Sequence, residues 1–452
     1  MEKSNLEVDS RFYRKVFALV IPMAIQNLIN VGVMATDVIM LGKVGEVTLS
    51  GCSLGGQVAF VMNLFLFGIT SGASVLTAQY WGKRDTESIE RILGIALRFS
   101  MIASVLFMAV TLLIPVQVMH LFTNDEAIIA EGVKYLRIVA LTYPISAFSA
   151  SYLNIIKSVE KVVISTIVYA SSLIANILIN WVLIFGKLGF PAMGIEGAAI
   201  GTLVARILEL LITLYYAKYR NREIKVHMSY FLKTDIVLMK DFLKYSGPVI
   251  CNELLWGLGY SVSAAIIGHL GSSAVAANSV AQVVRQLSMV IVFGIGNATS
   301  IMLGQVLGEG KKELAEVYSK RFIKLALVGG IIGGITVLIA SPVIIWGLGF
   351  KDVTAVYMKD FLIVMSYYVI GQALNTTWVV GIFRAGGDTK FGLFLDSGIM
   401  WGISIFGGFM AAFVFKLSVP VVYVILLSDE IIKIPICMVR CRQKKWLNNL
   451  TR

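Results

Sequence analysis

Charged side chains are scarce in this sequence. Asp, Glu, Lys and Arg make up 15% of its 452 residues, whereas a soluble globular chain carries about 25%. Hydrophobic residues make up 57%, and the mean hydropathy is +0.81. This balance excludes an ordinary soluble domain and is typical of a polytopic membrane protein.

Other expected signals are also missing. The four cysteines lack the spacing of a metal site, the three histidines stand far apart, and LGEGKK at 307–312 misses the GxxxxGK[ST] spacing of a phosphate loop. The N-terminal segment has no short apolar core followed by a small-residue cleavage site. We therefore expect no metal, no other cofactor, no enzymatic activity, no nucleotide-driven mechanism and no removable signal peptide.

Long apolar stretches are what the sequence does contain. A transmembrane helix needs about 20 mostly apolar residues, and charge clusters separate stretches of that kind. We expect an all-α integral membrane protein with twelve transmembrane helices, at 16–41, 50–80, 92–116, 134–156, 162–185, 195–217, 242–268, 274–307, 322–348, 358–383, 391–415 and 418–440.

The positive charges alternate between the loops. Of the 39 Lys and Arg, 28 fall in the N-terminus, the even-numbered loops and the C-terminal tail, and four lie within spans. The opposite side has seven, namely Lys43, Lys134, Arg137, Lys187, Lys351, Lys359 and Lys416. Since loops rich in Lys and Arg stay in the cytoplasm, we expect an inner-membrane protein with both termini cytoplasmic. The net charge of +12 then reflects anchoring in the lipid bilayer and predicts no nucleic-acid partner.

The chain is a duplication. Shifted by 226 residues, 22–90 aligns with 248–316 without a gap, and 14 of the 69 pairs are identical, where composition alone would give roughly five. Six helices separate equivalent positions, so the repeat is parallel. We expect two six-helix lobes, 1–225 and 226–452, joined by a cytoplasmic linker around 216–235, with substrate bound between them near the membrane midplane.

Asp37 is an acid within the apolar stretch VGVMATDVIMLGKVGE, at 31–46. An isolated ionised carboxylate in lipid costs several kcal/mol or more. Its repeat counterpart is Ser263, so the duplicated helix does not itself require a carboxylate at this place. Asp37 therefore looks like an added function.

Three motifs in order resemble the MATE family of multidrug and toxic compound extrusion transporters. They are the first helix with Pro22, Gln26, Asp37 and MLGKVG, then NILINWVLIFG (176–186) with GIEGAAIGT (194–202), and GIFRAGGDTK (381–390). The resemblance implies a V-shaped pair of six-helix bundles that exports organic, often cationic compounds in exchange for Na⁺ or H⁺. It also implies that Asp37 binds the coupling proton or cation in the N-terminal lobe.

Two amides accompany Asp37 in this hypothesis. Asn176 and Asn180 lie four residues apart, on one face of a helix. They can hydrogen-bond Asp37 or coordinate the ion through their amide oxygens, and interhelical hydrogen bonding alone remains the alternative. Some relatives carry an acid where Asn180 stands.

A second set of ionisable residues belongs to the C-terminal half. Glu253 matches a glutamate that some family members use for ion binding, and its repeat counterpart is Asn27. Arg285 lies in the middle of a span and needs an anion nearby, so we predict a pair with Glu253 or with Asp396. Asp396 is either a functional intramembrane acid or an interfacial one. Local ion pairs are expected for Arg206 with Glu209 and for Lys433 with Asp429 and Glu430.

Polar, aromatic and methionine side chains are candidates for the substrate pathway, because soft, polarizable walls suit varied substrates. Ordinary packing is the alternative for each. The candidates are Gln26, Met34, Tyr143, Trp256, Tyr260 and Met289.

The predicted function is that of a monomeric secondary antiporter, which exports small organic cations by alternating access. A lipid-linked precursor flippase or polysaccharide exporter of the same superfamily is the alternative. A flippase cavity needs several cations for a pyrophosphate, and Arg285 is the mid-span candidate.

Overall fold

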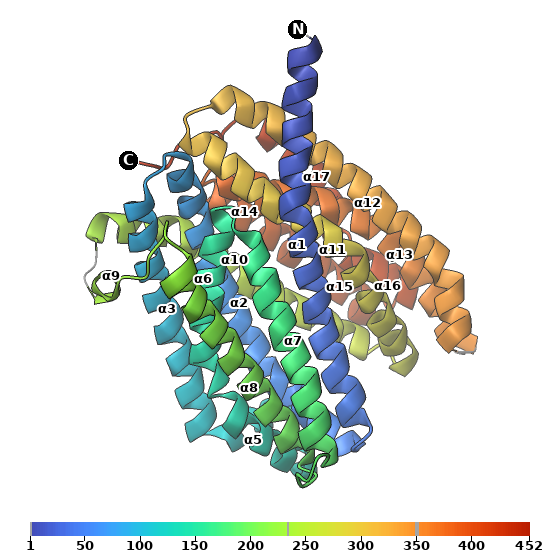
Figure 1. Cartoon of the computed structure of the whole chain (residues 1–452). Coiled ribbons are helices and arrows are strands. Elements are labelled where there is room, and N and C mark those ends of the chain that lie inside the picture. The colour runs from blue at the N-terminus through green and yellow to red at the C-terminus, as the bar shows by residue number, and fades with distance from the viewer. Residues whose placement is uncertain (1, 233–234, 349–351) are drawn as a thin grey trace. The chain divides into compact units, whose positions relative to one another are not determined.

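The computed structural model describes residues 2–232, 235–348 and 352–452, and its regular structure is helical over them (Figure 1). Lys233 and Lys351, which the charge count assigns to loops, lie outside these residues.

The first part of the chain folds into nine α-helices and one π-helix. They are α1 (Glu2–Gly42), α2 (Glu46–Gly82), α3 (Thr86–Leu113), α4 (Pro115–His120), α5 (Glu126–Val139), α6 (Thr142–Ser158), α7 (Val162–Phe185), α8 (Gly194–Tyr215), the π-helix η1 (Tyr216–Arg220) and α9 (Met228–Leu232).

The remaining described residues contain three further π-helical segments. The elements are α10 (Ile236–Gly268), α11 (Ser272–Gly308), α12 (Lys312–Leu348), α13 (Asp352–Thr376), η2 (Thr377–Phe383), α14 (Thr389–Ile399), η3 (Met400–Ile405), α15 (Phe406–Phe409), η4 (Met410–Val414), α16 (Val419–Leu426) and α17 (Asp429–Arg442).

Within these ranges, ten helices are long and apolar enough to cross a membrane. An eleventh span is the pair α5 and α6, bent by 52°. Pro144 lies in the first turn of α6 and has no amide hydrogen with which to continue α5. The twelfth predicted span, 418–440, is divided into α16 and α17. The prediction of an all-α integral membrane protein is confirmed.

The break in the last span positions two acids. Asp429 and Glu430 form the first turn of α17, where the positive end of the helix dipole favours negative charge. Ser404 and Ser428 are joined by a hydrogen bond of 3.1 Å at this break. The predicted span 418–440 is therefore interrupted by a helix N-terminus that carries two acidic side chains.

The described chain forms two compact units. Unit 1 consists of Met1–Ala24, Ala78–Arg84 and Cys251–Arg452, and unit 2 of Ile25–Thr77 and Asp85–Ile250. Helices α1, α2 and α10 each contribute residues to both units. The division into lobes at 225/226 stays a prediction.

Each unit has its own apolar core. In unit 2, Met62 of α2 packs with Tyr143 of α6 and Ile195 of α8. In unit 1, α10, α11, α13 and α16 share a core, in which the rings of Phe361 and Tyr423 stack 3.6 Å apart.

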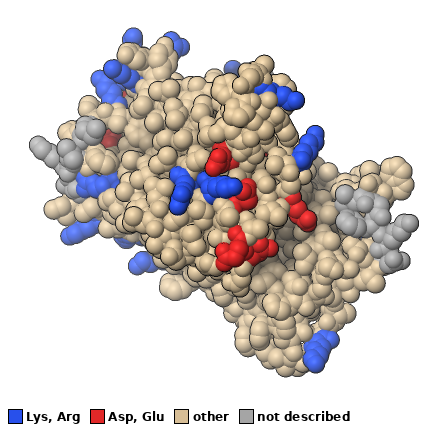
Figure 2. Space-filling model, turned by 90° about the horizontal axis from the view of Figure 1, so that it is seen from below, with Lys and Arg blue, Asp and Glu red and all other residues tan. Residues whose placement is uncertain are grey.

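Figure 2 shows one face of the molecule, on which uncharged residues predominate and acidic side chains gather near the middle.

Candidate functional site

Asp37 is held by amide groups in unit 2. The Nδ2 atom of Asn180 donates to Oδ1 of Asp37 at 2.7 Å and to Oδ1 of Asn176 at 3.3 Å. Asn176 in turn donates to Oγ1 of Thr202 at 3.5 Å. The structure thus brings together the three predicted residues of the N-terminal site, and its arrangement is a chain of neutral dipoles that ends at one carboxylate.

Glycines of α8 make this arrangement possible. Helices α7 and α8 run side by side (Figure 1), and a Cβ built on Gly197 would lie 2.7 Å from the backbone of Leu183. A Cβ on Gly201 would collide with Oδ1 of Asn180. Small residues four apart allow helices to approach closely in a membrane. The GIEGAAIGT stretch therefore fixes where Asn180 lies.

A pocket opens beside this site within unit 2. Its empty volume is about 330 Å³, counting its open mouth. Asn176 and Thr202 belong both to the pocket wall and to the hydrogen-bonded chain that leads to Asp37. Ile29, Asn30, Val33, Tyr169, Ser172, Ala205 and Arg206 complete the wall. The expected local ion pair of Arg206 with Glu209 is present at 2.6 Å.

Three of the pathway candidates lie in unit 2, in different settings. Gln26 is buried and donates to Oγ1 of Thr166 at 2.9 Å. Met34 is 65% exposed. Tyr143 is buried in the core of this unit, so in this structure it is a packing residue and lines no open surface.

In unit 1 the carboxylate of Glu253 is paired with a cation. Nη2 of Arg384 lies 2.6 Å from Oε1 of Glu253, and the side chains are 4% and 13% exposed. The charge count places Arg384 in the connection after the span 358–383; in the structure it directly follows η2 and is buried against Glu253 of α10.

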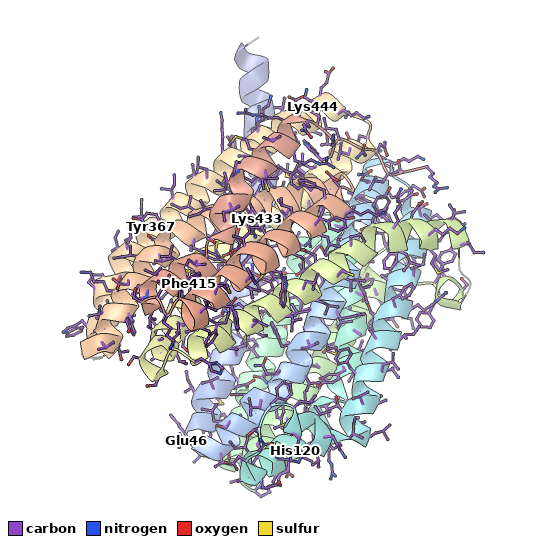
Figure 3. All side chains as sticks on the ribbon, turned by 180° about the vertical axis from the view of Figure 1, so that it is seen from behind. Glu46, His120, Tyr367, Phe415, Lys433 and Lys444 are labelled. Atoms are coloured by element: carbon purple, nitrogen blue, oxygen red, sulfur yellow. The ribbon has the colours of Figure 1, made fainter. Side chains whose placement is uncertain are left out.

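Asp396 belongs to a cluster around Lys433. The ammonium of Lys433 lies 2.6 Å from Asp396, 2.8 Å from Asp429 and 3.2 Å from Glu430. Lys433 is 1% exposed and Asp396 16%; Figure 3 labels Lys433 among the helices of unit 1. The expected ion pairs of Lys433 are therefore present, and they extend to Asp396, whose side chain is half-buried.

Asn252 lies between the Glu253–Arg384 ion pair and the cluster around Lys433. Its Nδ2 donates to Oδ2 of Asp396 at 3.1 Å, and Glu253 is the next residue in the chain. The four acids and two bases of this region thus form one connected arrangement in which each carboxylate lies against a cation.

The predicted partner of Arg285 was wrong. Arg285 donates from Nε to Gln282 at 2.8 Å and from Nη1 to Gln372 at 3.3 Å, while Arg384 and Lys433 lie against the two acids that had been proposed for it. Neutral amide oxygens thus satisfy the buried guanidinium.

The remaining pathway candidates lie in unit 1. Trp256 and Tyr260 are half-buried, and their rings stack at 5.9 Å with an interplanar angle of 19°. Met289 is fully buried in the core, so it packs there and does not face an open pathway.

Sequence reasoning missed Arg384 and the role of Lys433 as the partner of Asp396. The GIFRAGGDTK stretch carried the signal for Arg384, because the arginine directly follows an apolar run. For Lys433, the sequence indicates only the acids three and four residues before it on its own helix, Glu430 and Asp429.

Comparison with known proteins identifies the family. A model of the MatE family matches residues 22–182 and, a second time, residues 248–410. The two matches begin at the same residues as the self-alignment of the sequence, and together they cover more than half of the chain. The chain belongs to the MatE family. It is therefore a multi-pass membrane transporter for small molecules.

Relatives of this MatE protein align over most of their length. The probable multidrug resistance protein YoeA of Bacillus subtilis is 23% identical, over 91% of this chain and 89% of the relative. The probable multidrug resistance protein NorM of Thermotoga maritima is 25% identical, over 73% of this chain and 71% of the relative.

Solved structures confirm the fold. A variant of the Vibrio cholerae MATE transporter VcmN superposes with a TM-score of 0.87 at 16% identity, over 98% of both chains. A MOP superfamily transporter from Pyrococcus furiosus superposes with a TM-score of 0.87 at 17% identity, over 97% of this chain and 96% of that one. The expected fold, twelve helices in two six-helix halves related by a parallel repeat, is confirmed.

Among the residues that the structure describes, no group of three or more His, Cys, Asp or Glu side chains is arranged to hold a metal ion.

Proposed function

We propose that this MatE protein is a secondary antiporter that exports organic drugs, with organic cations as the expected class, in exchange for Na⁺ or H⁺ bound at Asp37. It works as a monomer in the cytoplasmic membrane, with both termini in the cytoplasm. Relatives named as multidrug resistance proteins support the substrate class, and the charge count of the loops supports the orientation.

The hydrogen bond between Asn180 and Asp37 carries this proposal. In that pair an uncharged amide holds the carboxylate, so no cation that is part of the protein has to be displaced before an ion or proton can bind. Burial favours the neutral acid and a bound cation favours the charged form. One group can thus exchange an ion for a drug.

Side-chain oxygens in the hydrogen-bonded chain that leads to Asp37 support Na⁺ as the coupling ion. The Asn176 side chain and Thr202 extend the chain of polar groups from Asp37 to the pocket, and Oδ1 of Asn180 is buried with no hydrogen-bond partner among the described residues. A sodium ion needs several such ligands, whereas a proton needs the carboxylate alone.

The flippase alternative finds no support in the buried cations. In the described part of the chain, half-buried Arg206 and buried Arg384 and Lys433 each lie against a carboxylate. A pyrophosphate would have to displace those acids, so the cations are poorly suited to bind one. The mid-span candidate Arg285 is held by the side-chain amides of two glutamines, and a single cation does not provide the several that a pyrophosphate needs.

Transport in sealed vesicles tests the function. Purified protein is reconstituted, Na⁺ and pH gradients are imposed independently, and the movement of ethidium is followed. We expect ethidium transport to follow the Na⁺ gradient at constant pH. Transport that follows the pH gradient and ignores Na⁺ would assign the proton instead, and no movement with either gradient would overturn the proposal.

A further inference from the structure

Two repeat-related segments cross tightly within unit 1. They are AQYWG, at 78–82 at the end of α2, and GQVLG, at 304–308 at the end of α11. A Cβ on Gly82 would collide with the carbonyl oxygen of Gln305, and a Cβ on Gly308 with that of Gln79. The repeat offset converts each of these contacts into the other, so the contact is self-complementary.

Small residues four apart are the reason for the close crossing. Ala78 and Gly82 form one such pair, and Gly304 and Gly308 form the other. At the centre, a Cβ on Gly304 would lie 2.7 Å from that of Ala78. Such pairs let two backbones meet within a membrane protein, and the crossing is accordingly closed to any side chain larger than those present.

The side chains of the crossing are not symmetric. Gln79 donates to the carbonyls of Ala385 at 2.7 Å and Asn448 at 3.1 Å, and it accepts from the amide of Leu450 at 2.6 Å. Its repeat counterpart Gln305 accepts from Lys15 of α1 at 3.0 Å, and its Nε2 is buried with no hydrogen-bond partner among the described residues. The end of the chain thus engages one glutamine of the pair.

The same tail also contacts the other arm of the crossing. Asn449 donates to the carbonyl of Gly308 at 3.4 Å, and Lys83 at the end of α2 donates to the carbonyl of Arg452. Trp446 is buried, and a Cβ on Gly386 would collide with its carbonyl oxygen. Lys444, labelled in Figure 3, pairs with Glu316 at 2.6 Å. The last residues therefore bridge α2 and α11.

We propose that residues 446–452 latch the crossing of α2 and α11 in its closed state, and that each transport cycle releases this latch. The proposal rests on the proposed function, because only a carrier that alternates between two open sides must part such a crossing. A few hydrogen bonds, each worth about 1 kcal/mol net, hold the crossing and still allow it to open repeatedly.

Hydrogen exchange of the purified protein tests the latch without any substrate or ion. Gln79→Leu is compared with the repeat-matched control Gln305→Leu, and a chain that ends at residue 445 provides a second variant. In Gln79→Leu and in the shortened chain, the backbone amides of residues 304–308 should exchange about tenfold faster than in the unmodified protein. In Gln305→Leu, the amides of the tail, residues 446–452, should exchange at an unchanged rate. Unchanged exchange in Gln79→Leu, or equal effects in both variants, would overturn the latch.

A reversible tether tests whether release is required for transport. Lys83 and Arg452, both exposed, become Lys83→Cys and Arg452→Cys in a chain without the four native cysteines, and a short bifunctional methanethiosulfonate joins them. Ethidium transport should stop on joining and return after dithiothreitol. Full transport by the joined protein would refute the latch, whereas absence of transport both before joining and after reduction would count against the proposed function.

Discussion

Two half-buried carboxylates in this protein differ in what surrounds the acid. Asp37 in unit 2 is held by Asn180 and, beyond it, Asn176. Asp396 in unit 1 shares Lys433 with two further acids. A carboxylate hydrogen-bonded by a neutral amide can accept a counter-charge from outside the protein, whereas one in contact with a lysine already has its counter-charge. The first arrangement suits exchange, and the second suits a fixed structure.

This difference extends to the cost of losing a partner. Removing one side of a buried ion pair leaves an uncompensated charge, which costs about 3–5 kcal/mol. Removing a neutral amide next to a carboxylate costs about one hydrogen bond. The two sites should therefore respond to mutation in different measurements, transport for Asp37 and stability for Lys433.

The largest effect is expected at Asp37. Asp37→Asn keeps the size of the side chain and removes the charge, so ethidium export driven by an ion gradient should fall to the level of empty vesicles while the protein remains folded. Glu46→Gln is the control, since Glu46 is exposed at the start of α2 and lies at the same end of unit 2 as His120 (Figure 3). Normal export by Asp37→Asn would show that the Asp37 carboxylate is not needed for coupling.

The next effect concerns Lys433. Lys433→Met leaves Asp396, Asp429 and Glu430 without their shared ammonium, so thermal unfolding in detergent should show a loss of about 3–5 kcal/mol. Lys320→Met serves as control, because Lys320 is exposed and its pair with Glu316 is worth under about 1 kcal/mol. Equal unfolding temperatures in the two variants would contradict a structural role for the cluster.

A smaller effect sharpens the account of the amide site. Gly201→Ala places a methyl on Oδ1 of Asn180 and forces the amide away from Asp37, at a cost of about 1–3 kcal/mol. The ion concentration for half-maximal transport should rise roughly tenfold. Gly398→Ala is the matched control, because a Cβ there has no atom within 4 Å. An unchanged ion dependence in Gly201→Ala would mean that Asn180 does not position Asp37.

Glu253 and Asp396 belong to two linked charged groups in unit 1, around Arg384 and Lys433, and mutation distinguishes their roles. Glu253→Gln removes the carboxylate 2.6 Å from Arg384, whereas after Asp396→Asn the ammonium of Lys433 retains Asp429 and Glu430. Transport rates should fall several-fold more in Glu253→Gln, because the buried guanidinium of Arg384 then loses the carboxylate beside it, although the fixed structure of this site is only indirectly needed for transport. Wild-type rates in both variants would exclude this site from coupling.

The smallest effect is expected outside the membrane-spanning segments, at Asp235. The amide of Leu238, joined by Arg91, hydrogen-bonds the Asp235 carboxylate and lowers its pKa. A lowered pKa means that the stabilisation is complete above the ordinary value of 3.8 and is lost only as the pH falls through the lowered value.

Divided by the rate at which trypsin cleaves a small peptide substrate at the same pH, cleavage of the segment between α8 and α10 should therefore be constant from about pH 8 to 6 and rise about twofold in Asp235→Asn. Asp125→Asn, which alters a similar cap at the start of α5, is the control. A relative cleavage rate that changes across this pH range in the unmodified protein would show that another group controls the segment.

The sequence predicted the helices well because each depends on local apolar length. The span expected at 162–185 coincides with α7, and the parallel repeat followed from a shift of the sequence against itself. The last span was less accurate, since the division between α16 and α17 depends on charges whose partners come from distant helices.

Of the site, the sequence predicted what one helix face determines. Asn176 and Asn180 share a face of α7, and both belong to the chain of hydrogen bonds that ends at Asp37. The partner of Arg285 could not be predicted in this way. Its choice between acids and amides depends on contacts between residues 87 positions apart, and nothing in the local pattern distinguishes Gln372 from Glu253.

The self-complementary crossing of α2 and α11 has a consequence for the origin of the chain. A contact in which each side presents the same patch to the other is the isologous contact of a two-fold symmetric dimer. Before duplication, one substitution in a six-helix ancestor would have altered both sides of the crossing at once. Fusion of two copies allowed Gln79 and Gln305 to acquire different neighbours, while the glycines that both backbones need remained the same.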